Sequence, residues 1–490
     1  MHRAVARPVG AVVVGCAAGM LLCALVGFAF EILEYRRDVD AGAAAAMGIS
    51  GLLTAALGGG LMAWGRTATR ALSRREAVVA VTAIWVAVSV VGAMPFVFDA
   101  GFSPIDGLFE AASGFTTTGA TMVDDIEGQL SRTLLLWRSL MQWLGGMGIV
   151  VLFVAIFPNL GVSGKRLFRS EVPGVTADGL RPRITETSVA LWQLYLGFTA
   201  LETVVLWGLG MSPFESLCHA MTTMSTGGFS TRNASIAAFD TPAIEYVISV
   251  FMLIAGVNFG LYYGALRSRR AGVLLRSSEF RVYAVLSVLL TLAITLFVLP
   301  NHGQLELAFR RALFMVSTTI TSTGFGTDDY MAYPPPALAL VIGLMFIGGS
   351  SGSTAGGIKV SRIVVLAETA RAMIRRSVRP AVVQVVRLER KPMETPVLLE
   401  VATFFFLYMS CLAVGVFGVA WIERIPLSTA FGAMLTTLSN MGPAPFYEGV
   451  DNFSGYSAGA KVWFAAMMIL GRLEFFTVLA LLMPDTWRRH

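Results

Sequence analysis

The sequence contains few charged residues for its length. Only 14% of its 490 residues are Asp, Glu, Lys or Arg, whereas about one quarter of the residues in soluble domains are charged. Hydrophobic residues make up 55% of the chain, and the mean hydropathy is +0.69. This composition excludes an ordinary soluble domain, and we predict an integral membrane protein.

Cysteine is also scarce, and its placement argues against a metal centre or a disulfide framework. The four cysteines lie in or beside apolar stretches without the spacing of metal ligands; they are Cys16, Cys23, Cys218 and Cys411. Buried cysteines usually behave as small apolar side chains. We therefore interpret all four as packing residues.

Long apolar runs are abundant. An α-helix needs about 20 residues to cross about 30 Å of hydrocarbon, and we predict spans at about 9–30, 43–64, 77–98, 133–157, 187–211, 243–265, 283–299, 337–374 (interrupted), 397–421 and 461–483. The first run is long for a signal peptide and shows no clear small-residue cleavage site. We therefore interpret it as a membrane helix.

The basic residues predict the orientation of these spans, because Lys and Arg stay on the cytoplasmic side of a membrane. They gather before the first span and after every even-numbered span, at 3–7, 66–75, 165–183, 267–276, 371–391 and 488–489. This pattern places both termini in the cytoplasm. It also explains the net charge of +6 without a nucleic-acid partner.

A short pattern occurs four times between the predicted spans. The segments are SGFTTTGATMVDD (113–125), MTTMSTGGFSTRN (221–233), STTITSTGFGTDD (317–329) and LTTLSNMGPAPFYEGVD (435–451). We align them on Gly119, Gly227, Gly324 and Gly442. One Thr-Gly segment would usually be a simple turn, but four in matching positions predict a fourfold repeat of helix, short half-helix, polar loop and helix.

The repeated loops have the chemistry of a cation path. Segments such as SPIDGLFEAASGF (103–115) are too short to span, and irregular backbone is tolerated at membrane depth only where protein buries it or water lines it. Backbone carbonyls can replace the hydration shell of a cation. Acidic residues follow the loops and predict an acidic mouth with Arg232 as its one basic exception; they are Asp124, Asp125, Asp328, Asp329, Glu448 and Asp451.

These features resemble the Trk/Ktr/HKT superfamily of potassium transporters, most closely its bacterial TrkH type. Besides the four units, the resemblance rests on the additional N-terminal helix pair (about 9–64), SEVPGVTADGLRPRITETSVALW (170–192), GGSSGSTAGGIKVSR (348–362) and GRLEFFTVLALLMP (471–484). The Ktr type usually lacks the additional pair and is our second choice. The resemblance covers essentially the whole chain.

The resemblance implies a potassium filter, with carbonyl groups before each glycine among the ion ligands. The implied filter residues are Thr117, Thr118, Gly119, Ala120, Ser225, Thr226, Gly227, Gly228, Ser322, Thr323, Gly324, Phe325, Asn440, Met441, Gly442 and Pro443. Glycine in all four loops is associated in the family with selectivity for potassium. The last loop departs from the Thr-Gly pattern, so we do not expect strict fourfold symmetry.

The glycine-rich run GGSSGSTAGGIK (348–359) lacks the G-x-x-x-x-G-K-[ST] pattern of a phosphate-binding loop. The apolar run before it, 337–347, is about half a span, so we predict a helix broken near the middle of the bilayer. A kinked helix with a close-packing glycine face is the alternative. The resemblance implies a gate formed by Gly348, Gly349, Ser350, Ser351, Gly352, Ser353, Thr354, Ala355, Gly356 and Gly357, with Lys359 and Arg472.

Several charged or titratable residues lie in or near the predicted spans. An arginine within an apolar span normally faces a partner or a water-filled cavity, and we predict that Arg472 projects into the pore. For Arg138, Glu202 and Lys359, helix packing and pore roles remain equally open. We interpret His219 as a packing or hydrogen-bonding residue rather than a proton relay.

The sequence thus predicts an all-α integral membrane protein without catalytic chemistry. The expected parts are an N-terminal helix pair (1–74) and pore repeats at 75–185, 186–277, 278–394 and 395–490. The resemblance implies potassium as the transported ion, a homodimer in the bacterial inner membrane, surrounded by lipid, and a cytosolic TrkA-type nucleotide-binding regulatory subunit. The basic loops 165–183, 267–281 and 371–391 could bind that subunit or serve orientation alone. Sodium-dependent Ktr-type transport and proton-coupled symport remain alternatives.

Overall fold

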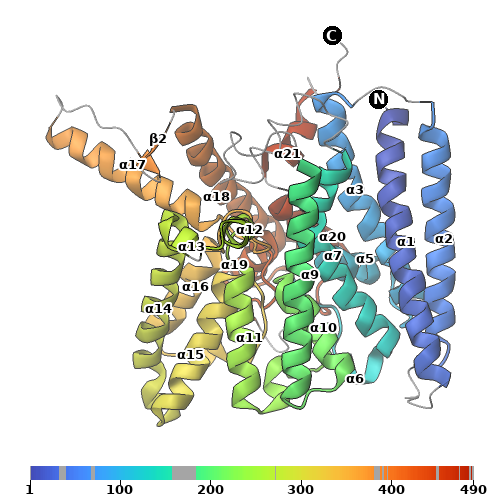
Figure 1. Ribbon diagram of the computed structural model, residues 1–490, viewed down its shortest axis with the longest axis horizontal. Helices are drawn as coiled ribbons and strands as arrows, with labels where there is room; N and C mark the ends of the chain where they lie inside the picture. Colours follow the sequence, from blue (N-terminus) through green and yellow to red (C-terminus); the bar gives the residue numbers. More distant parts are fainter. Residues whose placement is uncertain are drawn as a thin grey trace.

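The computed structural model describes residues 2–32, 40–67, 72–156, 184–270, 272–379, 387–388, 391–393, 395–447, 452–473, 475–484 and 487. Helices dominate this part of the chain (Figure 1). The α-helices are α1 (His2–Ile32), α2 (Ala43–Gly65), α3 (Arg74–Gly92), α4 (Met94–Phe98), α5 (Pro104–Phe115), α6 (Ile126–Gln129), α7 (Arg132–Ile156), α9 (Ile184–Gly208), α10 (Pro213–Met224), α11 (Pro242–Ala255), α12 (Phe259–Ser268), α13 (Gly272–Arg276), α14 (Ser278–His302), α15 (Leu305–Ile320), α16 (Pro335–Ile347), α17 (Val360–Val378), α18 (Thr395–Glu423), α19 (Leu427–Ser439), α20 (Ala458–Arg472) and α21 (Phe475–Leu479).

Little other regular structure accompanies these helices. The short 3₁₀ helices are η3 (Ser235–Phe239), η4 (Tyr330–Ala332) and η5 (Ala480–Leu482), and β1 (Arg387–Leu388) pairs antiparallel with β2 (Lys391–Pro392). The predicted all-α fold class is therefore confirmed, apart from this two-residue strand pair.

The N-terminal helices α1 and α2 pack as a close pair at one flank of the molecule (Figure 1). Glycine allows the close approach, since a Cβ atom built on Gly10 would lie 2.6 Å from the carbonyl oxygen of Gly58. Small residues at helix crossings permit such packing in membranes. The additional pair predicted from the sequence is present.

The helices that precede the four repeated loops are each too short to cross a membrane; they are α5, α10, α15 and α19, with 12, 12, 16 and 13 residues. Two of them begin with the same signal, a serine N-cap followed by proline. The Ser103 and Ser212 hydroxyls accept hydrogen bonds from the backbone N–H groups of Asp106 and Glu215, which stabilises the helix start. These are the half-helices that the repeat predicts.

The long spans are only partly continuous. Within the described residues, six helices are long and apolar enough to cross a membrane, or eight if two bent helix pairs each count as one span. The predicted interruption of the eighth span is present, because α16 ends at Ile347 and α17 begins at Val360. The tenth predicted span also divides, with α20 ending at Arg472 and α21 beginning at Phe475.

The prediction of one continuous sixth span at 243–265 was wrong. The chain bends by 87° between α11 and α12. The Asn258 side chain caps the new helix by accepting a hydrogen bond from Gly260 N–H at 2.7 Å, and the Gly256 carbonyl accepts one from Ser350 N–H at 2.9 Å. Capping and a distant loop therefore satisfy backbone groups that the break exposes.

The two ends of the molecule are distinct. The start of α1 and helix α21 lie at one end, whereas α6 lies at the opposite end (Figure 1).

One buried apolar cluster joins residues of α14, α15, α16, α18, α19 and α20, and a second joins α1, α3, α5 and α7. These clusters hold the half-helices in fixed positions between the longer helices.

Candidate functional site: a ring of four loops

Each half-helix ends in the same backbone turn. Near the end of each half-helix, an N–H group donates to a carbonyl five residues earlier, in the pairs Thr118–Ser113, Gly227–Thr222, Thr323–Thr318 and Met441–Thr436. The residue before each of these donors has φ of 54° or 55°; these residues are Thr117, Thr226, Ser322 and Asn440. This is the Schellman arrangement, which satisfies helix carbonyls and turns the chain away from the helix axis.

A glycine in the left-handed region follows each turn. The four glycines are Gly119, Gly228, Gly324 and Gly442, with φ of 83°, 77°, 84° and 25°. The alignment on Gly227 in the second loop was therefore wrong by one residue. This loop contains two consecutive glycines, and α10 ends at Met224, which places Gly228 in the turn. The equivalent segments are thus 117–120, 226–229, 322–325 and 440–443, and Ser225 is a helix cap.

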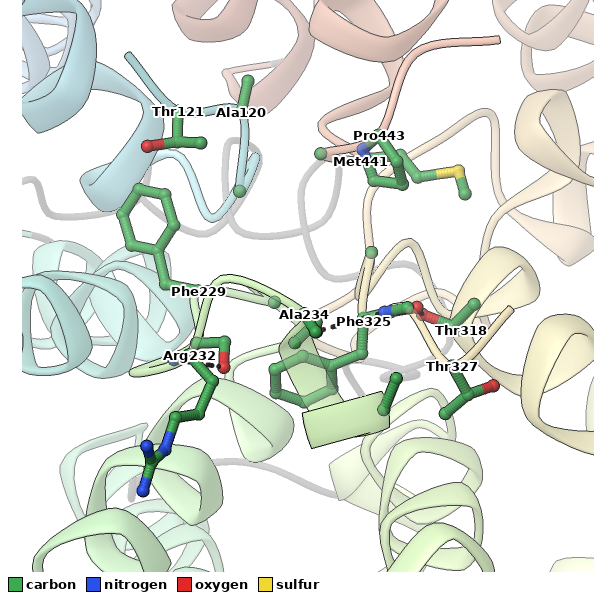
Figure 2. Close-up of a pocket in the computed structure, with 18 of the residues that line it drawn as sticks. Ala120, Thr121, Phe229, Arg232, Ala234, Thr318, Phe325, Thr327, Met441 and Pro443 are labelled. Atoms are coloured by element: carbon green, nitrogen blue, oxygen red, sulfur yellow. Dashed lines mark hydrogen bonds between the residues drawn. The ribbon is translucent and has the colours of Figure 1, made fainter. Parts of the chain in front are cut away.

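The loops form a closed ring. A Cβ atom on Gly119 would lie 2.2 Å from the Gly227 carbonyl oxygen, and one on Gly228 would lie 1.9 Å from that of Thr323. The ring continues because a Cβ atom on Gly324 would lie 2.9 Å from Pro443 Cδ. It closes where Gly442 N–H donates to the Thr118 carbonyl oxygen. The four predicted filter segments therefore lie together around one centre (Figure 2).

A cavity of about 610 Å³ opens on one side of this ring. Its lining includes residues from all four loops: Gly119, Ala120, Gly228, Phe229, Gly324, Phe325, Met441, Gly442 and Pro443. Figure 2 shows Ala120, Phe229, Phe325 and Pro443, each directly after a ring glycine, arranged around the opening. The cavity thus leads from the surface to the ring.

The predicted acidic mouth is only partly present. Asp328 and Asp329 line the cavity. Asp124 instead accepts hydrogen bonds from Asn452 and Ser454. The Asn233 amide donates to Asp125 and holds the pKa of that carboxyl below its usual range. Glu448 and Asp451 lie outside the described residues.

Arg232, the basic exception, is neutralised at the mouth. Its guanidinium lies 2.6 Å from a Glu127 oxygen and 2.7 Å from a Glu215 oxygen. The hydrogen bond to Glu127 raises the pKa of Arg232 above its ordinary value. The positive charge that would repel cations is therefore offset by two carboxylates.

A buried ion pair braces the first two loops. Arg138 of α7 lies 2.8 Å from Glu110 of half-helix α5, and both are almost fully buried. Glu110 also accepts a hydrogen bond from Met122 N–H at 2.9 Å. Arg138 donates to the Ser230 carbonyl at 3.3 Å and stacks on Phe229 with 4.0 Å to the ring centroid. Arg138 thus fixes two loops relative to each other.

His219 occupies the position in α10 that Glu110 occupies in α5. Its Nδ1 lies 2.8 Å from the Glu215 carbonyl oxygen, and its Nε2 lies 2.9 Å from Ser230 Oγ. A carbonyl can only accept, so Nδ1 carries the proton and Nε2 accepts from the serine. These contacts agree with the hydrogen-bonding interpretation of His219.

Gln142, a residue that sequence reasoning missed, holds the second loop directly. It is fully buried on α7. Its Nε2 donates to the Gly227 carbonyl at 2.7 Å, and its Oε1 accepts from Phe229 N–H at 3.1 Å. One amide thus binds two backbone groups on either side of Gly228. A glutamine inside the predicted 133–157 span was the available signal.

The glycine-rich segment 348–357, which we call the gating loop after the role that the resemblance implies, lies against the ring on the side where the half-helices end. Gly356 N–H donates to Ser322 Oγ at 2.6 Å, and Gly357 N–H donates to the Ser439 carbonyl at 3.0 Å. The Thr354 hydroxyl donates to the Met224 carbonyl at 3.0 Å. The loop therefore touches the second, third and fourth repeats, opposite the cavity. It joins two helices and lacks the strand of a phosphate-binding loop.

Arg472 binds the gating loop. Its guanidinium donates to the Thr354 carbonyl at 2.8 Å and to the Gly145 carbonyl of α7 at 3.1 Å. The side chain is 7% exposed. Within the described residues it has no carboxylate partner in an ion pair, and Glu474 lies outside them. The arginine thus joins the loop to α7.

The other two predicted charges occupy different places. Lys359 directs its Nζ to the Ala355 carbonyl within the gating loop. Glu202 is fully buried on α9, which packs on half-helix α10, and it is not among the residues that line the cavity.

Comparisons with known proteins agree with this arrangement. A model of the cation transport protein family TrkH matches residues 45–486. The Trk system potassium uptake protein TrkH of Salmonella typhimurium is 36% identical over 497 residues, covering 100% of both chains. That of Vibrio parahaemolyticus is 37% identical over 440 residues, covering 88% of this chain and 90% of the relative.

A solved structure is similar over nearly the whole chain. The crystal structure of the potassium transporter TrkH from Vibrio parahaemolyticus superposes with a TM-score of 0.88 at 33% identity, covering 99% of each chain. The fold, the match to the family model and the full-length relatives together lead to one conclusion: the chain belongs to the TrkH family of cation transport proteins.

Proposed function

We propose that the protein takes up potassium across the inner membrane through the ring of four loops. The observation that carries this proposal is the closed ring of Gly119, Gly228, Gly324 and Gly442, entered from a cavity that all four loops line. Relatives along the whole chain are named potassium uptake proteins.

Backbone oxygens are the proposed ion ligands. No group of three or more His, Cys, Asp or Glu side chains that could hold a metal ion occurs in the part of the chain that the structure describes. The C-terminal ends of four half-helices, which carry partial negative charge, converge on the ring. Carbonyl groups of the four loops would then replace the hydration shell of the ion.

The gating loop is the proposed gate. It lies directly against the ring on the side away from the cavity, so an ion leaving the ring meets it first. Opening would require the loop to release Ser322, Ser439 and Met224. Arg472 would hold the loop closed and place a positive charge beside the path.

The remaining assignments are proposals of the same kind. The chain would form a homodimer and act with a TrkA-type nucleotide-binding regulatory subunit, with both termini in the cytoplasm. The names of the relatives refer to a Trk system, which supports additional components. The predicted boundaries of the helix pair and the four repeats remain as proposed from the sequence.

Flux measurements in proteoliposomes test this function. We expect a potassium gradient alone to drive potassium flux, without a pH or sodium gradient, and we expect slower flux when sodium is the sole permeant cation. Equal potassium and sodium rates would contradict the selectivity. A strict requirement for a proton or sodium gradient would instead favour coupled transport.

A further inference from the structure

The gating loop is held from a second side by a carboxylate. Glu279 lies in the first turn of α14 and is only 9% exposed. Its Oε1 accepts a hydrogen bond from the backbone N–H of Ser351 at 2.6 Å. A buried carboxylate is costly unless it is paired or hydrogen-bonded. The contact with the loop is therefore one of the interactions that make this burial possible.

Two further groups, at the junction of the loop and α17, lie beside this contact. The Ser351 hydroxyl pairs with the Ser361 hydroxyl in the first turn of α17, which ties the loop to the helix that follows it. Lys359, two residues after the loop and directly before α17, supplies a charge opposite to that of Glu279. The carboxylate thus meets both the middle of the loop and its C-terminal anchor.

Glu279 and Arg472 both bind the backbone of the loop, one as a hydrogen-bond acceptor and the other as a donor. Arg472 donates to the Thr354 carbonyl, and Glu279 accepts from the Ser351 N–H three residues earlier. Each is a charge-assisted hydrogen bond to backbone, the stronger class of hydrogen bond. The two side chains come from helices on either side of the loop in the sequence, α14 and α20, and bind the same short loop.

The position of Glu279 connects the loop to the protein surface. α14 follows α13 after the single residue Ser277. Exposed arginines precede it closely: Arg267, Arg269, Arg270 and Arg276. The buried start of α12, which precedes these arginines, also binds the loop, because Phe259 N–H donates to the Gly352 carbonyl at 3.2 Å. A displacement of the chain between α12 and the start of α14 would therefore move Phe259 and Glu279, which both bind the loop.

We infer that Glu279 is a positioning residue that latches the gating loop in its closed conformation. The inference rests on the gate proposed above and adds a latch that the sequence did not suggest. Loss of the latch favours the open loop. Loss of a hydrogen bond to a charged group is expected to increase basal flux about tenfold.

Potassium flux through the full-length protein in proteoliposomes tests the latch. Glu279→Ala is expected to raise basal flux about tenfold at matched protein amount, and Glu279→Gln, which keeps an acceptor oxygen but loses the charge, to raise it less. Misfolding would lower flux, so an increase is not explained by damage. Glu368→Ala is the control, because Glu368 is 42% exposed and pairs with Arg371 at the surface.

The outcomes separate the latch from the gate. Unchanged or lower flux in Glu279→Ala, with increased flux in Arg472→Ala, would overturn the latch and leave the gate intact. Unchanged flux in both variants would overturn the gate and the latch together. If Glu279→Ala is not recovered as folded protein, Glu279→Gln decides in the same way, and flux equal to that of the unaltered protein would overturn the latch.

Discussion

Replacing Gly119 by alanine perturbs the ring at one defined contact. Gly119 has φ of 83°, and an L-residue in this region loses about 1–2 kcal/mol. The new Cβ would lie 2.2 Å from the Gly227 carbonyl oxygen, whereas carbon and carbonyl oxygen normally approach to about 3.3 Å. Because the atoms that this Cβ would meet are all backbone atoms, of Gly227 and Gly442, no rotamer change relieves the clash. The first two loops must separate by roughly 1 Å.

The consequence is a wider ring with fewer oxygens at the distance that potassium requires. Overpacking in a tight site typically costs about 1–3 kcal/mol. If about 1.4 kcal/mol of this appears as lost discrimination between potassium and sodium, the selectivity ratio falls tenfold. We expect Gly119→Ala to reduce the ratio of potassium to sodium flux by at least this factor.

The assay is flux in proteoliposomes with potassium or sodium as the sole permeant cation. Gly326→Ala is the matched control, because Gly326 lines the same cavity and a Cβ there would meet only Ser235 Cβ at 3.9 Å. The control should keep the original ratio. An unchanged ratio in folded Gly119→Ala protein would refute the argument that the ring contact sets selectivity.

Three further predictions follow from the contacts of the site. Gln142→Leu leaves the Gly227 carbonyl without its side-chain partner, at a cost of about 1–3 kcal/mol; the potassium to sodium flux ratio should fall, and an unchanged ratio would exclude a role in the filter. Arg472→Ala removes the hydrogen bonds to the Thr354, Gly145 and Gly146 carbonyls, so basal potassium flux should rise, whereas equal or lower flux would indicate a purely structural role. Arg138→Met leaves Glu110 buried without its ion-pair partner, which costs about 3–5 kcal/mol; thermal unfolding in detergent should shift to lower temperature, and an unchanged midpoint would contradict this pairing.

Segment length made the half-helices predictable. A run such as 103–115 cannot span a bilayer, and the apolar run before the gating loop is about half a span. The serine N-caps at Ser103 and Ser212 mark helix starts in the sequence itself. Both features depend on local chemistry, so the structure agrees with them.

The register of the second loop was not predictable in the same way. Two adjacent glycines, Gly227 and Gly228, fit the pattern equally well, and the choice depends on where α10 ends. The break between α11 and α12 depends on Ser350, about a hundred residues away in sequence, which binds the Gly256 carbonyl. Short-range patterns carry no information about such a partner.

For the buried polar side chains, the need for a partner was predictable from the sequence, but the identity of the partner was not. Arg138, Gln142 and Glu202 stand out in apolar runs, so the sequence indicates that each needs a partner. It does not reveal that Arg138 meets Glu110 from another helix or that Gln142 meets the backbone of the ring. These partners are brought together only by the packing of the four repeats.

The central claim is that four loops surround one potassium ion with backbone oxygens. A structure determined in the presence of rubidium, a heavier alkali ion that is easily located, tests it most directly. We expect rubidium on the axis of the ring, with carbonyl oxygens from the segments 117–120, 226–229, 322–325 and 440–443 around it. Rubidium bound elsewhere, with the ring axis empty, would contradict the claim.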